Sequence, residues 1–243
     1  MNYGLYTAFL GMRSRQRTLD AQANNIANAS TTGFKAERLL YSTFEADRKS
    51  ETDKQTLVAG VATTNLTDFS TGSFQQTGRA LDVAIEGDAF LQIQSKNGVR
   101  YTRAGNFSLN AAGQLVTKNG DLVVGERGGI TLPNQGQISI GEDGSIAVEG
   151  QVLDKLKLVR FNNPASALTQ EGNSLFVANG KENSSPNTNS RVIQGTLESS
   201  NINPVSEMVA MINNNREFES LQKSVTLLMN DLGRKIAGEI GKI

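Results

Sequence analysis

Two stretches at opposite ends of the chain share one spacing of apolar residues, and this spacing constrains the fold more than any other feature. Between Tyr3 and Asn28, and again from Val205 onward, apolar positions follow one another at alternating steps of three and four residues. This heptad spacing creates an apolar seam that is narrower than the apolar stripe of a helix on a globular core. Such a seam is typical of helices that pack against helices. We therefore predict coiled-coil-like helices that pair at the chain ends. The predicted interface residues are Leu5, Phe9, Met12, Leu19, Ile26, Met208, Met211, Ile212, Phe218, Val225, Met229 and Leu232.

The apolar seams of both predicted helices are interrupted by polar or small residues. Gln16 and Ala23 fall on the first seam, and Asn215 and Gln222 fall on the second. A pair formed only within one chain would therefore be underfilled, whereas packing among many subunits would bury more of each helix. We predict that the terminal helices are largely disordered in the free monomer and become ordered on assembly.

The ends of these helices carry local signals. Asn24, Asn25 and Asn28 have side chains that compete for backbone hydrogen bonds, and Gly33 can adopt the left-handed conformation that closes a helix. Pro204 suits the first position of the second helix, with Asn203 as its N-cap. The first helix is therefore expected to end before Gly33, and the second to begin at Pro204.

The region between the helices changes to the period-two alternation of β-strands. Short apolar strands are separated by tight turns at intervals of about ten residues, for example at Asn97-Gly98, Asn119-Gly120 and Asp143-Gly144. This pattern predicts a largely antiparallel, all-β domain, sandwich or barrel-like. The polar stretch 45–56 is predicted to be an exposed or disordered excursion.

The expected fold class is therefore α+β, with terminal helices that flank the β domain. The predicted organisation has four parts: an N-terminal axial helix over 1–33, an extended connector over 34–73, a β-rich domain over 74–198, and a C-terminal axial helix over 199–243.

Composition excludes several classes of function. The 24 Lys and Arg residues balance 24 Asp and Glu residues, so no net charge attracts nucleic acid or an anionic membrane surface. The chain has no Cys and no His, and it therefore lacks disulfides, thiolate metal ligands and the commonest general base. No phosphate-binding glycine motif occurs. We predict no catalytic, cofactor or metal site, and we expect Arg13, Arg15 and Arg17, which fall off the seam, to lie on a solvated helix face.

The amino-terminal sequence lacks a basic segment followed by an apolar one, and no run approaches the roughly 20 apolar residues that span a bilayer. We therefore predict no direct membrane insertion, and we expect any export to use a route without a cleaved signal peptide.

Several motifs resemble one protein family. Residues 19–35, Leu-Asp-Ala-Gln-Ala-Asn-Asn-Ile-Ala-Asn-Ala-Ser-Thr-Thr-Gly-Phe-Lys, are similar to the amino-terminal signature of bacterial flagellar rod and hook axial proteins; we call them the signature segment. Residues 82–91 and 101–116 resemble core strands of these proteins, and residues 195–212 resemble their carboxy-terminal module, most closely that of proximal-rod members. The motif residues singled out are Asn24, Asn25, Asn28, Thr32, Gly33, Phe34, Asn203 and Pro204.

The resemblance implies a non-enzymatic building block of the periplasm-spanning basal-body rod, which transmits torque in motility. Its implied partners are other rod proteins, copies of itself and the flagellar type III export apparatus. Two alternatives stay open: a distal-rod or hook-like axial protein and, in a different class, a secreted β-domain binding module dimerised by a coiled coil. An enzyme is a third alternative, which requires a pocket with convergent ionisable groups.

Overall fold

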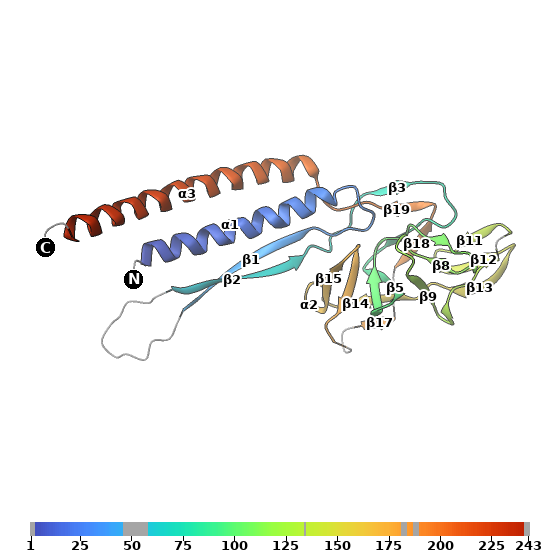
Figure 1. Ribbon diagram of the computed structural model, residues 1–243. Helices are drawn as coiled ribbons and strands as arrows, with labels where there is room; N and C mark the ends of the chain where they lie inside the picture. Colours follow the sequence, from blue (N-terminus) through green and yellow to red (C-terminus); the bar gives the residue numbers. More distant parts are fainter. Residues whose placement is uncertain (1–2, 46–57, 134, 181–183, 187–189, 241–243) are drawn as a thin grey trace. The chain divides into compact units, whose positions relative to one another are not determined.

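The chain forms two compact units, each built from more than one segment of the sequence. The computed structural model describes residues 3–45, 58–133, 135–180, 184–186 and 190–240, so the predicted excursion at 45–56 lies almost wholly outside the described residues. The first unit comprises Met1–Ala27, Glu37–Leu66 and Asn203–Ile243, and the second comprises Asn28–Ala36 and Thr67–Ile202. The architecture is α+β, with a helix near each end of the chain and a largely antiparallel β region between them (Figure 1).

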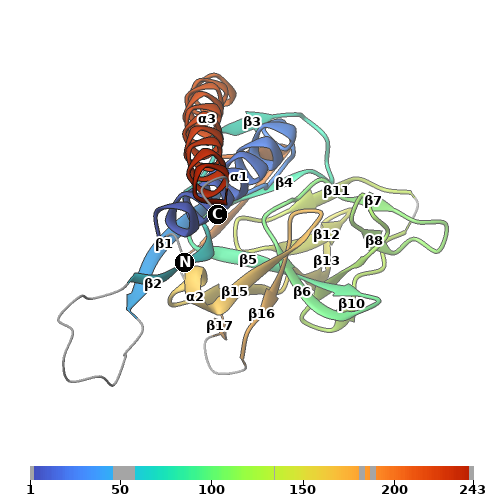
Figure 2. The ribbon, with the colours of Figure 1, turned by 60° about the vertical axis from the view of Figure 1, so that its left-hand side comes forward.

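The first unit contains two long helices and a two-stranded sheet. Its elements are α1 (Tyr3–Ala27), β1 (Glu37–Glu45), β2 (Val58–Thr67) and α3 (Pro204–Ile240). The helices α1 and α3 run in opposite directions and lie side by side, while β1 contacts α1 and pairs with β2 (Figure 2). The region predicted as a connector thus contains a pair of strands that packs with the helices.

The helix boundaries follow from local sequence. Asn203 caps α3, because its Oδ1 accepts hydrogen bonds from the backbone N–H groups of Val205 at 3.1 Å and Ser206 at 3.2 Å. Glu207 adds a negative charge to the first turn, where the helix dipole favours it. Beyond α1, Gly33 has a φ of +65°, the left-handed conformation predicted for it. The N-cap and the glycine predicted from the sequence are both confirmed.

The second unit is built from short strands and one turn of helix. Its elements are β3 (Phe74–Gln76), β4 (Val83–Glu86), β5 (Ala89–Ser95), β6 (Gly98–Thr102), β7 (Ser108–Leu109), β8 (Leu115–Val116), β9 (Leu122–Gly125), β10 (Gly128–Gly129), β11 (Ile138–Ile140), β12 (Ser145–Val148), β13 (Gln151–Lys155), β14 (Leu158–Phe161), α2 (Pro164–Ala167), β15 (Leu168–Gly172), β16 (Leu175–Ala178), β17 (Ser184–Pro186), β18 (Arg191–Gln194) and β19 (Thr196–Glu198).

Most of these strands belong to one large antiparallel sheet. Its main path runs β15-β16-β6-β5-β9-β8-β7; β10 is added beside β9, and β14 lies between β5 and β17. A smaller sheet has the order β11-β12-β13, and two further pairs join β18 to β4 and β19 to β3. The predicted turns are confirmed at Asn97-Gly98, Asn119-Gly120 and Asp143-Gly144, which connect β5 to β6, β8 to β9 and β11 to β12.

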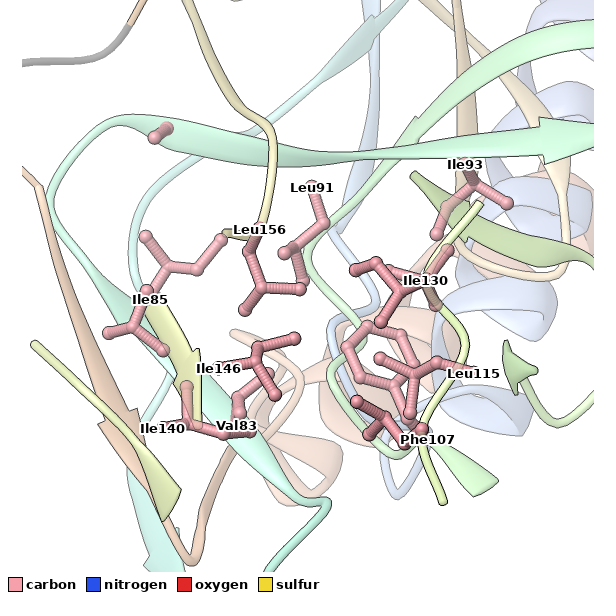
Figure 3. Close-up of a cluster of buried hydrophobic side chains, with 14 of the residues drawn as sticks. Val83, Ile85, Leu91, Ile93, Phe107, Leu115, Ile130, Ile140, Ile146 and Leu156 are labelled. Carbon is pink, nitrogen blue, oxygen red and sulfur yellow. The ribbon is translucent and has the colours of Figure 1, made fainter. Parts of the chain in front are cut away.

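The strands alternate their side chains into a buried apolar core. In β12, for example, Ile146 and Val148 are buried while the residues before them are half-buried, as period two requires. Figure 3 shows side chains from separate strands, including Val83, Ile140 and Ile146, gathered into one cluster. A second cluster is aromatic: the rings of Phe90 and Phe161 lie 5.8 Å apart, edge to face. Both clusters belong to the second unit.

Candidate assembly interface

Asn25 joins three elements of the first unit at the end of α1. Its side chain is 3% exposed; Nδ2 donates to the backbone oxygen of Glu37 at 2.9 Å, and Oδ1 accepts from the backbone N–H of Glu37, also at 2.9 Å. Nδ2 also donates to Glu207 Oε1 at 3.1 Å. A buried amide needs partners for its donors and its acceptor, and this position supplies them from β1 and α3. Asn25 therefore fixes the end of α1 against both elements.

Further polar contacts connect α1 to α3. Arg15 Nη1 donates to Asn214 Oδ1 at 3.0 Å, and Arg15 Nη2 lies 2.6 Å from Glu217 Oε2. Asn214 Nδ2 donates to Gln22 Oε1 at 3.0 Å, and the Gln22 side chain is 9% exposed. Arg15 was predicted to lie on a solvated helix face; its side chain is 41% exposed, and it also contacts α3. Charge patterning alone could not place an acidic partner from the other end of the chain beside it.

The interface residues predicted from heptad spacing fall into three groups. The exposed group contains Phe9, Met208, Ile212 and Met229. The half-buried group contains Met12, Leu19, Ile26, Met211, Phe218 and Val225. The side chains of Leu5 and Leu232 lie outside the described part of the structure.

The second half of the signature segment is part of the second unit. Gly33 donates its N–H to the backbone oxygen of Glu198 at 2.8 Å, and Phe34 is 3% exposed. A Cβ atom on Gly33 would lie 2.4 Å from the backbone nitrogen of Ala104, so no other residue fits without displacing the chain. Ser174 Oγ donates to the backbone oxygen of Thr32 at 3.3 Å. This part of the segment is therefore held by packing and backbone contacts, while Asn24 is exposed and Asn28 accepts from Thr31 Oγ1 at 3.2 Å.

A buried network of charges lies next to Gly33. Lys35 Nζ is 2.6 Å from Glu198 Oε1 and donates to the backbone oxygen of Ser70 at 2.7 Å. Arg103 Nη1 lies 3.5 Å from Glu198 Oε2 and donates to the backbone oxygen of Ile85 at 3.1 Å. Burial lowers the pKa of Lys35 and of Arg103, and the Glu198 carboxylate opposes both shifts. The network joins the signature segment to β19, which lies within the stretch that resembles the carboxy-terminal module.

Sequence reasoning did not single out Lys35, Arg103 or Glu198. The available signal was weak. Lys35 stands between the apolar residues Phe34 and Ala36, which suggests burial, and a buried lysine requires an acidic partner. Its partner lies 163 residues away, so no local pattern identifies it.

The described residues contain neither a metal-binding cluster nor a membrane-spanning helix. No group of three or more acidic side chains there is arranged to hold a metal ion, in a chain that has no His or Cys. No helix in the described portion is both long enough and apolar enough to cross a membrane.

Three protein-family models match the chain, one after another along the sequence. The model for the flagella basal body rod protein matches residues 5–35, the model for the flagellar hook protein FlgE/F/G D1 domain matches 84–148, and the model for the flagellar basal body rod FlgEFG protein C-terminal region matches 193–227.

Relatives match over nearly their whole length. The flagellar basal-body rod protein FlgF of Caulobacter vibrioides is 35% identical, with 100% of both chains covered. FlgG of Bacillus subtilis is 34% identical over 91% of this chain and 93% of its own, and FlgF of Salmonella typhimurium is 34% identical over 96% and 97%.

Paired terminal helices with exposed apolar side chains, attached to an antiparallel β unit, define a structural subunit of a flagellar axial assembly. The chain belongs to the flagellar basal-body rod protein family and is a structural subunit of the rod.

Proposed function

We propose that the chain is a proximal-rod subunit whose terminal helices pack, in a coiled-coil-like manner, against helices of neighbouring subunits. The observation that carries this proposal is apolar surface that the described part of the chain leaves uncovered. On α1, Phe9 is 60% exposed, and on α3, Met208 is 48% and Ile212 is 53% exposed. Removing such side chains from water is favourable and requires another molecule to cover them. The helices then form the inner layer of the rod, and the assembled tube transmits torque in motility.

The partners follow from this role. They are other rod proteins, further copies of this chain and, before assembly, the flagellar type III export apparatus, which the chain enters without a cleaved signal peptide. Its site of action is the periplasm-spanning part of the basal body. We infer no direct membrane insertion, no binding to nucleic acid and no enzymatic activity, and the balance of 24 basic with 24 acidic residues supports the second of these inferences.

A place in the distal rod, or a hook-like role, is the second candidate function. Relatives named FlgF and FlgG match this chain with nearly the same identity, 35% and 34%. Labelling the chain in purified basal bodies and locating the label along the rod distinguishes the two positions.

The test of assembly through the helices replaces one exposed apolar side chain by a charge. Ile212→Asp, expressed in a strain that lacks the wild-type gene, should be exported normally, but its amount in purified basal bodies should fall roughly tenfold or more, because burying an unpaired carboxylate is costly. The matched control is Asn213→Asp, the next residue of α3 and also exposed, which should assemble like the wild type. Equal incorporation of the two variants would contradict the proposal.

A further inference from the structure

A set of polar contacts connects α1 to α3, and we call it the polar ladder. The polar ladder consists of Arg15, Gln22 and Asn25 on α1 and Glu207, Asn214 and Glu217 on α3. Asn214 contacts two of its members at once, because Oδ1 accepts from Arg15 at 3.0 Å and Nδ2 donates to Gln22 at 3.0 Å. The two helices of one chain thus meet partly through amides and charges, while Phe9, Met208 and Ile212 are exposed.

The polar ladder stands beside half-buried apolar residues of α3, among them Met211, Phe218 and Val225. Apolar residues normally fill the contact between two helices, and polar residues there reduce stability while fixing register and orientation. The Arg15–Glu217 pair is partly solvated, with side chains 41% and 53% exposed, so it contributes little net free energy. The main effect of the polar ladder is therefore to fix the position of the two helices relative to each other, rather than to stabilise the pair.

The polar ladder is satisfied in one register only. Asn25 lies opposite Glu207, and Arg15 lies opposite Glu217, so ten residues separate the two contacts on each helix. A slip of one helical turn would separate Gln22 from Asn214 and Asn25 from Glu207, although Asn25 would keep its two hydrogen bonds to Glu37. Losing a hydrogen-bond partner is costly for a buried polar group such as the Gln22 amide. An apolar contact would tolerate the same slip more easily, because its attraction has no fixed direction.

We propose that the polar ladder is the specificity-determining element of the helix pair: it fixes the antiparallel register of α1 and α3 and thereby aligns the outward apolar side chains for assembly. This inference rests on the proposed function for its assembly consequence, whereas the register itself is a property of the α1–α3 pair, which an isolated chain has whenever the two helices are formed. The two are tested by separate measurements.

The register can be measured directly because the natural chain contains no cysteine. Extending the spacing of the Asn25–Glu207 and Arg15–Glu217 contacts pairs Gly11 with Leu221, and a side chain at Gly11 meets nothing within 4 Å, so a spin label there has room. Labels on Gly11→Cys with Leu221→Cys report the native register, and labels on Gly11→Cys with Val225→Cys report a slip of one turn. In the purified full-length protein the native pair should show the shorter distance between labels. When Gln22→Leu and Asn214→Leu are added, the two distances should become similar, whereas an unchanged difference would overturn the proposal.

Assembly provides the second measurement. Arg15→Glu places two carboxylates together and should lower the amount of chain in purified basal bodies by roughly three- to tenfold, with export unchanged; adding Glu217→Arg should restore it. Gln22→Leu with Asn214→Leu should also assemble poorly, although its thermal midpoint should equal or exceed that of the wild type. A parallel fall in the midpoint would identify the ladder as an ordinary stabilising contact and overturn the proposal. If the native register is lost in solution but assembly is unaffected, the proposed function of the helices fails and the register assignment stands.

Discussion

The charged side chain of Lys35 is fully buried, and the carboxylate of Glu198 is the group that compensates its charge. Lys35→Met should lower the free energy of unfolding of the second unit by about 3 kcal/mol or more, because it leaves Glu198 buried with only part of its compensation. The measurement is denaturant-dependent hydrogen exchange of the amides of β5.

The control for this change is an exposed ion pair of the same unit. Arg160 lies 3.9 Å from Asp88, with side chains 46% and 79% exposed, so Arg160→Met should cost less than about 1 kcal/mol. If the two variants were equally stable, the buried network would not hold the signature segment.

Gly33 combines a left-handed backbone with close contact to Ala104. Gly33→Ala should cost about 1–3 kcal/mol more than the same change at a glycine that has room for a side chain, since the added Cβ would overlap the Ala104 backbone. Gly78 is the matched control, because its φ of +72° is similar and a Cβ there meets nothing within 4 Å. The same exchange experiment gives both values, and equal losses would show that only the backbone conformation matters.

Gly33 and Lys35 show which features of this site could be predicted from local sequence and which could not. The left-handed Gly33 was predictable, because a glycine after a polar helix end has few other reasons to be there. The pairing of Lys35 with Glu198 was not, because it depends on strands that bring residues 163 positions apart into contact. A local pattern can indicate that a charged side chain will be buried in the fold, but it cannot identify the residue that pairs with that side chain.

At the scale of the helices, heptad spacing predicted the two elements, and capping signals predicted the end of α1 and the start of α3. Neither signal predicted which face of each helix meets the other. Met211, Phe218 and Val225 are half-buried, whereas Met208 and Met229 from the same predicted seam are exposed. The apolar residues of a seam can pack within the chain or against neighbouring subunits, and both kinds of contact give the same spacing in the sequence. One sequence therefore cannot assign each seam residue to one of these contacts.

The start of α3 gives a prediction that belongs to this scale. Asn203→Ala should destabilise the first turn by about 1 kcal/mol, because the N–H groups of Val205 and Ser206 lose their acceptor. The exchange rates of these two amides measure the effect. Asn213→Ala, an exposed position within the helix, should show no loss, because alanine is the better helix former there. Loss in both variants would argue against a specific cap.

At the scale of the whole molecule, the two units differ in what holds them together. Both buried apolar clusters found among the described residues belong to the second unit, and they include Phe90, Leu91 and Ile93 of β5. The first unit relies on the polar ladder, on half-buried seam residues and on the contact between α1 and β1. Sequence patterning separated the helical regions from the β regions. It did not predict that residues 28–36 belong to the second unit, whereas residues 37–66 belong to the first unit together with the helices.

This difference predicts unequal protection in the isolated protein. Segments with few buried apolar contacts open without global unfolding, so the amides of residues 5–28 should exchange roughly a hundredfold or more faster than those of β5. In purified rods the same helical amides should become protected, because neighbouring subunits then cover the apolar side chains that a single chain leaves exposed. Hydrogen exchange with mass spectrometry on both samples measures the change, and β5 is the internal reference. Strong protection of residues 5–28 in the isolated protein would show that one chain stabilises its own terminal helices, and the coupling of their order to assembly would be wrong.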